Sequence, residues 1–282
     1  MTIPPAQSQP YPGETGQMTP EPRDEMRDYP GRGLLSGKRA LVTGGDSGIG
    51  RAVSVAFAKE GADVAIAYLS EDADARHTAG LVEAEGRRCL TIGGDVYDER
   101  HSRGLVARTV QEFGGIDVLV LHHGTQDPVD DVREIDTDHL ERTFNVNVHS
   151  LVWIVQESLA HMPDDGAIVV TGSINGLRGN KTLIDYSASK AAAMNFAQSM
   201  AQVLMDRGIR VNCVAPGPVW TPLIPATFDA ERVEGFGEQA PMSRPAEPDE
   251  IAPSYVFFAS NRLSSYYTGQ TLVPAGGEIH PG

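Results

Sequence analysis

The chain has 282 residues, which is long enough to bury a full core within a single α/β domain. Its formal net charge of −15 would repel an anionic nucleic-acid backbone or membrane surface, so neither is expected as a partner. The N-terminus lacks a basic, apolar leader, and no apolar run approaches the roughly 18 residues of a membrane span, which favours a cytoplasmic location.

The N-terminal segment, residues 1–36, is rich in proline and polar residues, and we refer to it as the N-terminal arm. Its prolines at positions 10, 12, 20, 22 and 30 interrupt any regular helix or strand. Two interpretations remain open: a disordered extension, or an arm that packs across a neighbouring subunit. Residues 37–282 are expected to form one catalytic domain.

From Lys38 onward, short β-branched runs alternate with helical periods such as Ile49, Val53 and Phe57. This pattern predicts an α/β fold with a doubly wound, Rossmann-type sheet of seven parallel strands, covered by helices on both faces. A second helical period comprises Leu140, Phe144, Val148, Leu151, Val155 and Leu159. The expected strands are residues 39–43, 63–68, 88–92, 116–121, 167–171, 210–215 and 270–274. Cys89 and Cys213 lie in such apolar runs, which favours buried thiols over a disulfide or a metal site.

The first expected strand runs directly into a glycine-rich loop, residues 43–50, and a helix follows at once. Gly44 permits a tight turn, Gly48 lets a pyrophosphate approach the backbone, and Gly50 lets the helix pack closely. A glycine motif in this context predicts a dinucleotide-binding loop. Its expected cofactor-binding residues are Gly44, Asp46, Ser47, Gly48, Ile49 and Gly50.

The end of the second expected strand bears on the choice between NAD and NADP. An acidic residue often stands there and holds the adenosine ribose of NAD, but this chain has Tyr68. Without a carboxylate a 2′-phosphate is not repelled, and Ser70 is placed to donate a hydrogen bond to it. Ser47 supplies no positive charge, and Glu71 and Asp72 oppose the phosphate. We expect NADP(H) to be favoured, with NAD(H) as a further cofactor.

Tyr186 and Lys190 stand one helical turn apart, on the same face of an expected helix. A phenol with an ordinary pKa of about 10 is a poor base at neutral pH, but a nearby ammonium group and a cationic nicotinamide lower that pKa. The phenolate then accepts an alcohol proton as hydride leaves for the cofactor. Ser173, at the carboxyl edge after the fifth expected strand, is expected to orient the substrate oxygen. Asn147, a poor helix former in an expected helix, is a candidate for a water-linked proton relay.

These residues, in this order, resemble the short-chain dehydrogenase/reductase family along nearly all of residues 38–277. The matching positions are a Thr-Gly-x-x-x-Gly-x-Gly loop at residues 43–50, Asp95, Asn147, Ser173 and a Tyr-x-x-x-Lys pair. The resemblance implies that Asp95 and Val96 flank the adenine, that residues 216–221 contact the carboxamide, and that the protein is a homotetramer. Cofactor-binding residues on this basis are Asp95, Val96, Gly124, Tyr186, Lys190, Pro216, Gly217, Val219 and Thr221.

The proline-rich arm, the Asp46-Ser47-Gly48 loop and residues 185–188 also resemble a bacterial subgroup of general-stress oxidoreductases, similar to glucose/ribitol dehydrogenases and to an NADP-dependent aldehyde reductase. The family usually shows Asn-Asn-Ala-Gly where this chain has Leu121-His122-His123-Gly124. The bulk of His123 is expected to alter the cofactor's position. Neighbouring side chains on an extended chain point to opposite faces, so one imidazole is available to a substrate pocket, and a metal site is not expected. Replacing His123 with Ala is expected to change the kinetics.

Residues 221–247 follow the expected carboxamide loop and are rich in Pro, Gly and acidic residues. They predict either a mobile substrate lid lined by Leu223, Ile224, Phe228 and Phe236, or a solvent loop packed on its own apolar residues. The chain is therefore expected to be an NAD(P)-dependent oxidoreductase acting on a small carbonyl or alcohol. A non-catalytic dinucleotide sensor is the alternative, whereas a sugar-nucleotide epimerase would need more chain after Lys190.

Overall fold

Seven strands form one parallel sheet in the computed structural model, which describes residues 3–278. The strand order is β3-β2-β1-β4-β5-β6-β7, so the chain winds away from β1 in one direction and from β4 in the other. This reversal opens a crevice at the carboxyl ends of β1 and β4. The predicted fold is confirmed, and the expected strand ends differ by no more than two residues. The strands are β1 (Arg39–Thr43), β2 (Asp63–Tyr68), β3 (Cys89–Gly93), β4 (Val118–Leu121), β5 (Ala167–Thr171), β6 (Arg210–Val214) and β7 (Thr271–Leu272).

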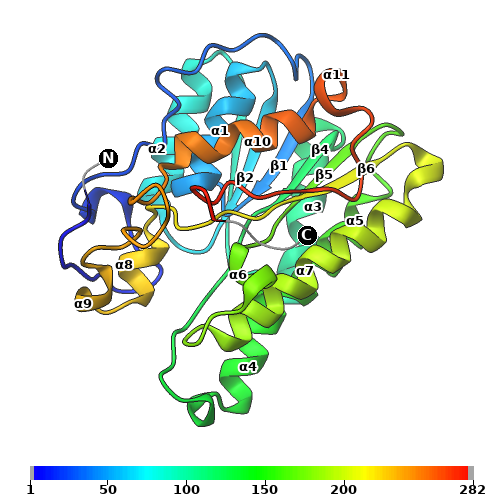
Figure 1. The fold of residues 1–282 in the computed structure, drawn as a ribbon. Coiled ribbons are helices and arrows are strands. Elements are labelled where there is room, and N and C mark those ends of the chain that lie inside the picture. The colour runs from blue at the N-terminus through cyan, green and yellow to red at the C-terminus, as the bar shows by residue number, and fades with distance from the viewer. Residues whose placement is uncertain (1–2, 279–282) are drawn as a thin grey trace.

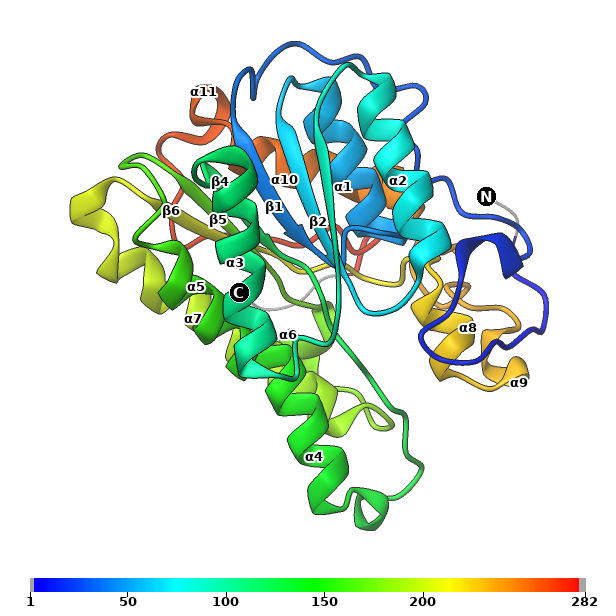
Figure 2. The ribbon, with the colours of Figure 1, turned by 180° about the vertical axis from the view of Figure 1, so that it is seen from behind.

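Helices cover both faces of the sheet (Figures 1 and 2). Alternation along β1 shows why, because Ala40 and Val42 pack in one apolar core and Leu41 packs in the other. The first core contains α1 (Gly48–Lys59), α2 (Asp72–Ala84) and α10 (Pro248–Ala259), and the second contains α3 (Glu99–Phe113), α5 (Ser150–Ser158) and α7 (Ile184–Val203). Shorter helices are α4 (Thr137–Phe144), α6 (Ile174–Arg178), α8 (Leu223–Thr227), α9 (Ala230–Val233) and α11 (Asn261–Ser264), with 3-10 turns η1 (Thr15–Gln17), η2 (Val132–Glu134) and η4 (Met205–Arg207). Between residues 3 and 278, no helix is long and apolar enough to span a bilayer.

A π-helical turn, η3 (Asn145–His149), joins α4 to α5. Leu151 and Val155, the part of the expected repeat in α5, are buried as predicted, whereas Leu140, Phe144 and Val148 before them are not in the core. A π turn shifts the phase of the side chains on its two sides. Val146 and Asn147 are buried, whereas Leu140 is 43% exposed. The buried face of α4 therefore does not continue in line into α5.

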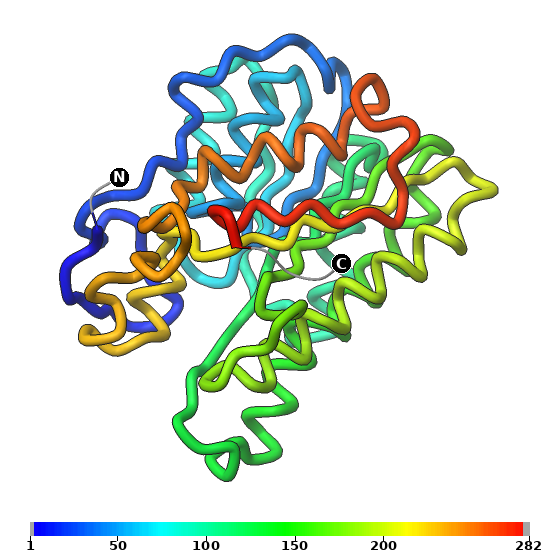
Figure 3. Tube along the Cα trace, viewed as in Figure 1, coloured from blue at the N-terminus to red at the C-terminus, as the bar shows by residue number. Residues whose placement is uncertain are grey.

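The N-terminal arm follows the surface of its own domain (Figures 1 and 3). Met18, Met26 and Leu35 are buried in the cores beneath it. Its backbone is hydrogen bonded along the way, as where the Met26 N–H donates to Asp249 Oδ1 at 2.9 Å. Polar partners on the domain replace the regular secondary structure that the prolines prevent.

Candidate functional site

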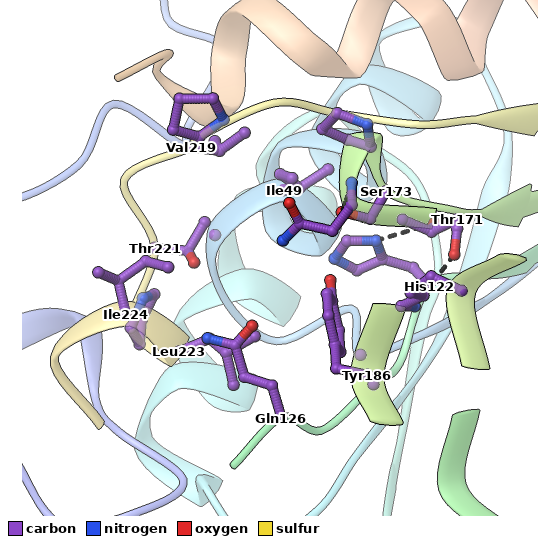
Figure 4. A pocket seen from close by; sticks show the side chains of 18 of the residues that line it. Ile49, His122, Gln126, Thr171, Ser173, Tyr186, Val219, Thr221, Leu223 and Ile224 are labelled. Atoms are coloured by element: carbon purple, nitrogen blue, oxygen red, sulfur yellow. Dashed lines mark hydrogen bonds between the residues drawn. The ribbon is translucent and has the colours of Figure 1, made fainter. Parts of the chain in front are cut away.

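A cavity of about 510 Å³ lies at the carboxyl edge of the sheet, and Figure 4 shows part of its wall. Most residues predicted for the site border it: Gly44, Asp46, Ser47, Gly48, Ile49, Tyr68, Asp95, Val96, Gly124, Ser173, Tyr186, Lys190, Pro216, Gly217, Val219 and Thr221. Gly50, Ser70 and Asn147 do not belong to the cavity wall formed by residues 3–278.

The glycine loop leaves no room for side chains at its turns. A Cβ atom at Gly48, where φ is +50°, would lie 2.9 Å from Thr221 Cγ2. A Cβ atom at Gly50 would lie 1.7 Å from the carbonyl oxygen of Gly44, so any side chain there would force α1 away from the loop. Ser47 is the N-cap of α1 without a side-chain cap hydrogen bond in the described part of the chain. The Gly48 N–H donates to Asp24 Oδ2 at 3.1 Å, and the Ile49 and Gly50 amides that follow it point toward the place of an anionic ligand. This loop fits the diphosphate of a dinucleotide.

Three polar side chains meet at the inner end of the cavity. Tyr186 and Lys190 lie in the first turns of α7, and Ser173 is the N-cap of α6, just beyond β5. Lys190 Nζ donates to the carbonyl oxygen of Thr171 at 3.0 Å and lies 5.8 Å from the centroid of the Tyr186 ring. Tyr186 and Ser173 both border the cavity (Figure 4). The structure thus brings these three predicted residues together.

Burial dominates the titration of this cluster. It raises the pKa of the Tyr186 phenol, and the interaction with the Ser173 hydroxyl acts in the opposite direction. Burial also lowers the pKa of Lys190 to about 8. At neutral pH the residues are therefore a phenol and an ammonium group, which is the protonation state that a carbonyl acceptor needs.

Asn147 lies behind the cavity, in the π turn. Its Oδ1 atom accepts from the Thr125 N–H at 2.8 Å, and its Nδ2 atom donates to the Thr125 carbonyl at 2.9 Å and to Ser189 Oγ at 3.0 Å. A Cβ atom at Gly124 would lie 3.2 Å from Lys190 Nζ and 3.4 Å from Asn147 Oδ1. The glycine therefore allows the amide and the ammonium group to approach the same point.

Both histidines border the cavity, but their rings make different contacts. His123 is buried, with Nδ1 2.6 Å from Thr43 Oγ1 and Nε2 2.7 Å from Ser150 Oγ. The His123 ring thus lies between β1 and α5, and its effect on the position of the cofactor stays a prediction. His122 is half-buried beside the cavity, with Nδ1 3.0 Å from Thr171 Oγ1 (Figure 4). Burial lowers the pKa of both imidazoles to about 3, so both are neutral.

Carboxyl groups surround the end of the cavity near Tyr68. Burial, and then the charge of Glu71, raises the pKa of Asp46 to about 7. Burial likewise raises the pKa of Glu71, and the Tyr68 hydroxyl donates to Asp72 Oδ1 at 2.6 Å. Ser70, expected to contact a 2′-phosphate, donates its backbone N–H to Glu71 Oε2 at 2.6 Å and lies outside the cavity wall. This local turn directs the Ser70 amide to a carboxylate, and the role expected for its hydroxyl stays a prediction.

Several residues that border the cavity were not predicted, namely Tyr11, Pro12, Gln126 and Arg142. Gln126 Nε2 donates to Thr227 Oγ1 at 2.9 Å, a contact across 101 residues that no local pattern signals. It joins the loop after β4 to α8. The apolar residues expected to line a lid, Leu223, Ile224, Phe228 and Phe236, do border the cavity.

Known proteins resemble this chain over most of its length. A family model described as enoyl-(acyl carrier protein) reductase matches residues 44–278. General stress protein 39 of Bacillus subtilis (strain 168) is 51% identical, over 98% of this chain and 96% of that protein. NADPH-dependent aldehyde reductase 1, chloroplastic, of Arabidopsis thaliana is 42% identical, with 95% of each chain covered.

Among solved structures, a short chain dehydrogenase from Burkholderia cenocepacia J2315 in complex with NADP matches with a TM-score of 0.81 and 34% identity. The structural alignment covers 86% of this chain and 98% of the Burkholderia chain. The sequence alignment with general stress protein 39 covers 98% of this chain, so it must include most of the N-terminal arm. Together with the sheet order and the glycine loop, these matches show that the chain is an NAD(P)-dependent oxidoreductase that belongs to the short-chain dehydrogenase/reductase family.

Proposed function

We propose that this oxidoreductase reduces small aldehydes or ketones, or oxidises the matching alcohols, with Tyr186 as its acid and base. The observation that supports this proposal is the position of Tyr186 in the cavity wall, beside Ser173 and Lys190. The residue borders the cavity together with Ser173, and Lys190 Nζ lies 5.8 Å from the centroid of its ring. A hydroxyl that orients an oxygen atom and a phenol that exchanges its proton are the groups that this chemistry requires.

When bound, the nicotinamide dinucleotide supplies or accepts the hydride. Ser173 Oγ orients the substrate oxygen, and the Tyr186 phenol donates its proton to a carbonyl or, as phenolate, accepts one from an alcohol. Lys190, held by the Thr171 carbonyl, keeps a positive charge near the phenol and so stabilises the phenolate. The Asn147 amide, fixed by Thr125 and Ser189, supports a water-linked path that returns the proton to solvent.

We propose NADP(H) as the favoured cofactor, with NAD(H) also accepted. Support comes from the names of the relatives, which include an NADPH-dependent reductase and a structure in complex with NADP. Within the site, Tyr68 ends β2 where a carboxylate would disfavour a 2′-phosphate. The pKa of Asp46, raised to about 7, reduces the negative charge that this carboxyl carries near neutral pH.

We further propose that residues 37–282 form one catalytic domain and that residues 221–247 serve as its substrate lid.

We propose that the protein assembles as a homotetramer. Leu140 on α4 is 43% exposed, and Phe144 and Val148 beside it are only half-buried. An apolar helix face of this kind is typical of a subunit interface. Light scattering on the purified protein would give the mass of the assembly, and a monomeric mass would exclude the tetramer.

Purified full-length protein should be tested with NADPH and NADH separately, against a panel of aldehydes, ketones and polyols. The absorbance of the reduced nicotinamide gives the rate in both directions. We expect turnover of several small aldehydes, with a higher kcat/KM for NADPH, since a partly apolar pocket discriminates weakly among them. Dinucleotide binding without turnover of any panel member would reject the enzymatic proposal and indicate a sensor.

A further inference from the structure

One wall of the cavity comes from the N-terminal arm, which the catalytic mechanism does not use. Tyr11 and Pro12 border the cavity together with the glycine loop and Asp95. Figures 1 and 3 show this part of the chain beside α8 and α9. A segment remote in sequence from the domain thus contributes directly to the surface that a dinucleotide would meet.

The tip of the arm, residues 4–13, contacts the proposed lid, residues 221–247, on one side. The Gln9 N–H donates to the Pro225 carbonyl at 2.7 Å. A Cβ atom at Gly13, where φ is +90°, would lie 2.6 Å from the Pro222 carbonyl oxygen, so the backbone there packs directly on the start of α8. The tip and α8 therefore form one continuous layer.

On the other side, Tyr11 borders the same cavity as a cation, Arg142. Arg142 of α4 borders the cavity, and its Nη1 atom lies 2.6 Å from Asp95 Oδ2, just beyond β3. Burial alone would lower the pKa of Arg142, but Asp95 and the contact with Tyr11 raise it. The tip therefore reaches from α8 to the side of the cavity where Asp95 stands.

The base of the arm, residues 20–24, is anchored separately. Asp24 Oδ2 accepts from the Gly48 N–H at 3.1 Å and lies 3.1 Å from Arg51 Nη1, so it holds the glycine loop. The Pro20 carbonyl accepts from Trp220 Nε1 at 2.7 Å, which holds the segment before the lid. Asp24 is 2% exposed and Trp220 is fully buried, so this base belongs to the folded core. The tip can therefore be altered while the base stays in place.

We propose that the tip of the arm retains the dinucleotide: residues 4–13 lie over the bound cofactor, with Tyr11 in the wall of its cavity, and must lift before the cofactor leaves. The proposal rests on the NAD(P) dependence of the protein and deepens it. Release then requires several contacts to break together, which slows dissociation. Tyr11 is 44% exposed, so its side chain contributes little to the stability of the fold.

The test compares full-length wild type with Tyr11→Ala and with a variant that lacks residues 1–13. Tyr266→Ala is the matched control, because that tyrosine is 99% exposed and does not border the cavity. Stopped-flow fluorescence gives the dissociation rate of NADPH after it is displaced by excess NADP, and a titration gives its Kd. Thermal melting without cofactor reports whether each variant is folded.

We expect Tyr11→Ala to release NADPH about 5 to 20 times faster than wild type, and the truncated protein at least as fast. The control should match wild type, and the melting temperature of Tyr11→Ala should stay within about 2 °C. Release rates within twofold of wild type in both arm variants would overturn the proposal, as would a wild type that binds no dinucleotide. Faster release without turnover of any substrate would support the arm's role and reject only the proposed reaction.

Discussion

Lys190 Nζ donates a hydrogen bond of 3.0 Å to the carbonyl oxygen of Thr171, the last residue of β5. The ammonium group is therefore held by the main chain of the sheet rather than by a carboxylate. A carboxylate partner would neutralise its charge, whereas a carbonyl dipole leaves most of that charge to act on the phenol beside it. This arrangement underlies the first two predictions.

Replacing Tyr186 with Phe should lower kcat by about 10²- to 10⁴-fold, because the variant keeps the ring but loses the exchangeable proton. The Kd for NADPH should change by less than about twofold, since the ring still packs in the cavity. Steady-state kinetics and a fluorescence titration measure the two quantities. Tyr266→Phe, at an almost fully exposed position, serves as the control. A Tyr186→Phe enzyme with full turnover would remove the proposed mechanism.

The two reaction directions should respond oppositely to pH. Burial raises the pKa of the Tyr186 phenol, so carbonyl reduction, which needs the phenol, is favoured at neutral pH. Alcohol oxidation needs the phenolate, so its kcat/KM should rise by about tenfold per pH unit below the phenol's pKa. The rise should flatten above pH about 8, where Lys190 loses the charge that stabilises the phenolate. Parallel profiles for oxidation and reduction would contradict this assignment.

The two histidines should behave differently when replaced by Ala. His123→Ala removes the partner of Thr43 and Ser150 and leaves a buried space, so the free energy of unfolding should fall by about 2–4 kcal/mol. His122→Ala should instead change KM for the substrate, with less than about 1 kcal/mol lost. Urea denaturation and substrate kinetics separate the two effects. The assignment fails if His123→Ala is as stable as wild type.

Arg51→Met should destabilise the protein by about 3–5 kcal/mol, because it leaves Asp24 and Asp74 buried without their cation. Burial, partly offset by Arg51, already raises the pKa of Asp24 to about 6. Protonation would relieve the unpaired charge, so the loss should be larger at pH about 8 than at pH about 5. Urea denaturation at both pH values tests this. Arg133→Met, which breaks an exposed pair with Asp131, should leave the stability close to that of wild type at both pH values.

The local sequence pattern was sufficient to predict the strands of the sheet and the proximity of Tyr186 and Lys190. The runs that form β1, β2 and β5 are β-branched and end at glycine or turn residues, so their bounds match the expectation. Tyr186 and Lys190 share a helix, and their spacing alone places them together. Local pattern did not show that Ser70 lies outside the cavity wall, because that depends on how the turn after β2 folds.

The remaining features depend on partners far away in the chain. The arm is ordered by contacts such as that between Pro20 and Trp220, which are 200 residues apart. The roles of His122 and His123 were decided by which hydroxyl groups, those of Thr171 and Ser150, stand opposite each ring. Periodicity and turn chemistry carry no information on such pairs, so their contacts could be found only in the folded chain.

The π turn at η3 holds one residue more than a regular helix of the same path. Removing that residue would therefore give an ordinary helix and leave the directions of α4 and α5 largely unchanged. A residue added to the regular helix of α4 beyond Arg142 would have a different effect, because each residue of an α-helix turns it by about 100°. It would withdraw Arg142 from Asp95 and turn Leu140 toward a different neighbour, so the cofactor cleft and the outer surface both depend on the length of α4.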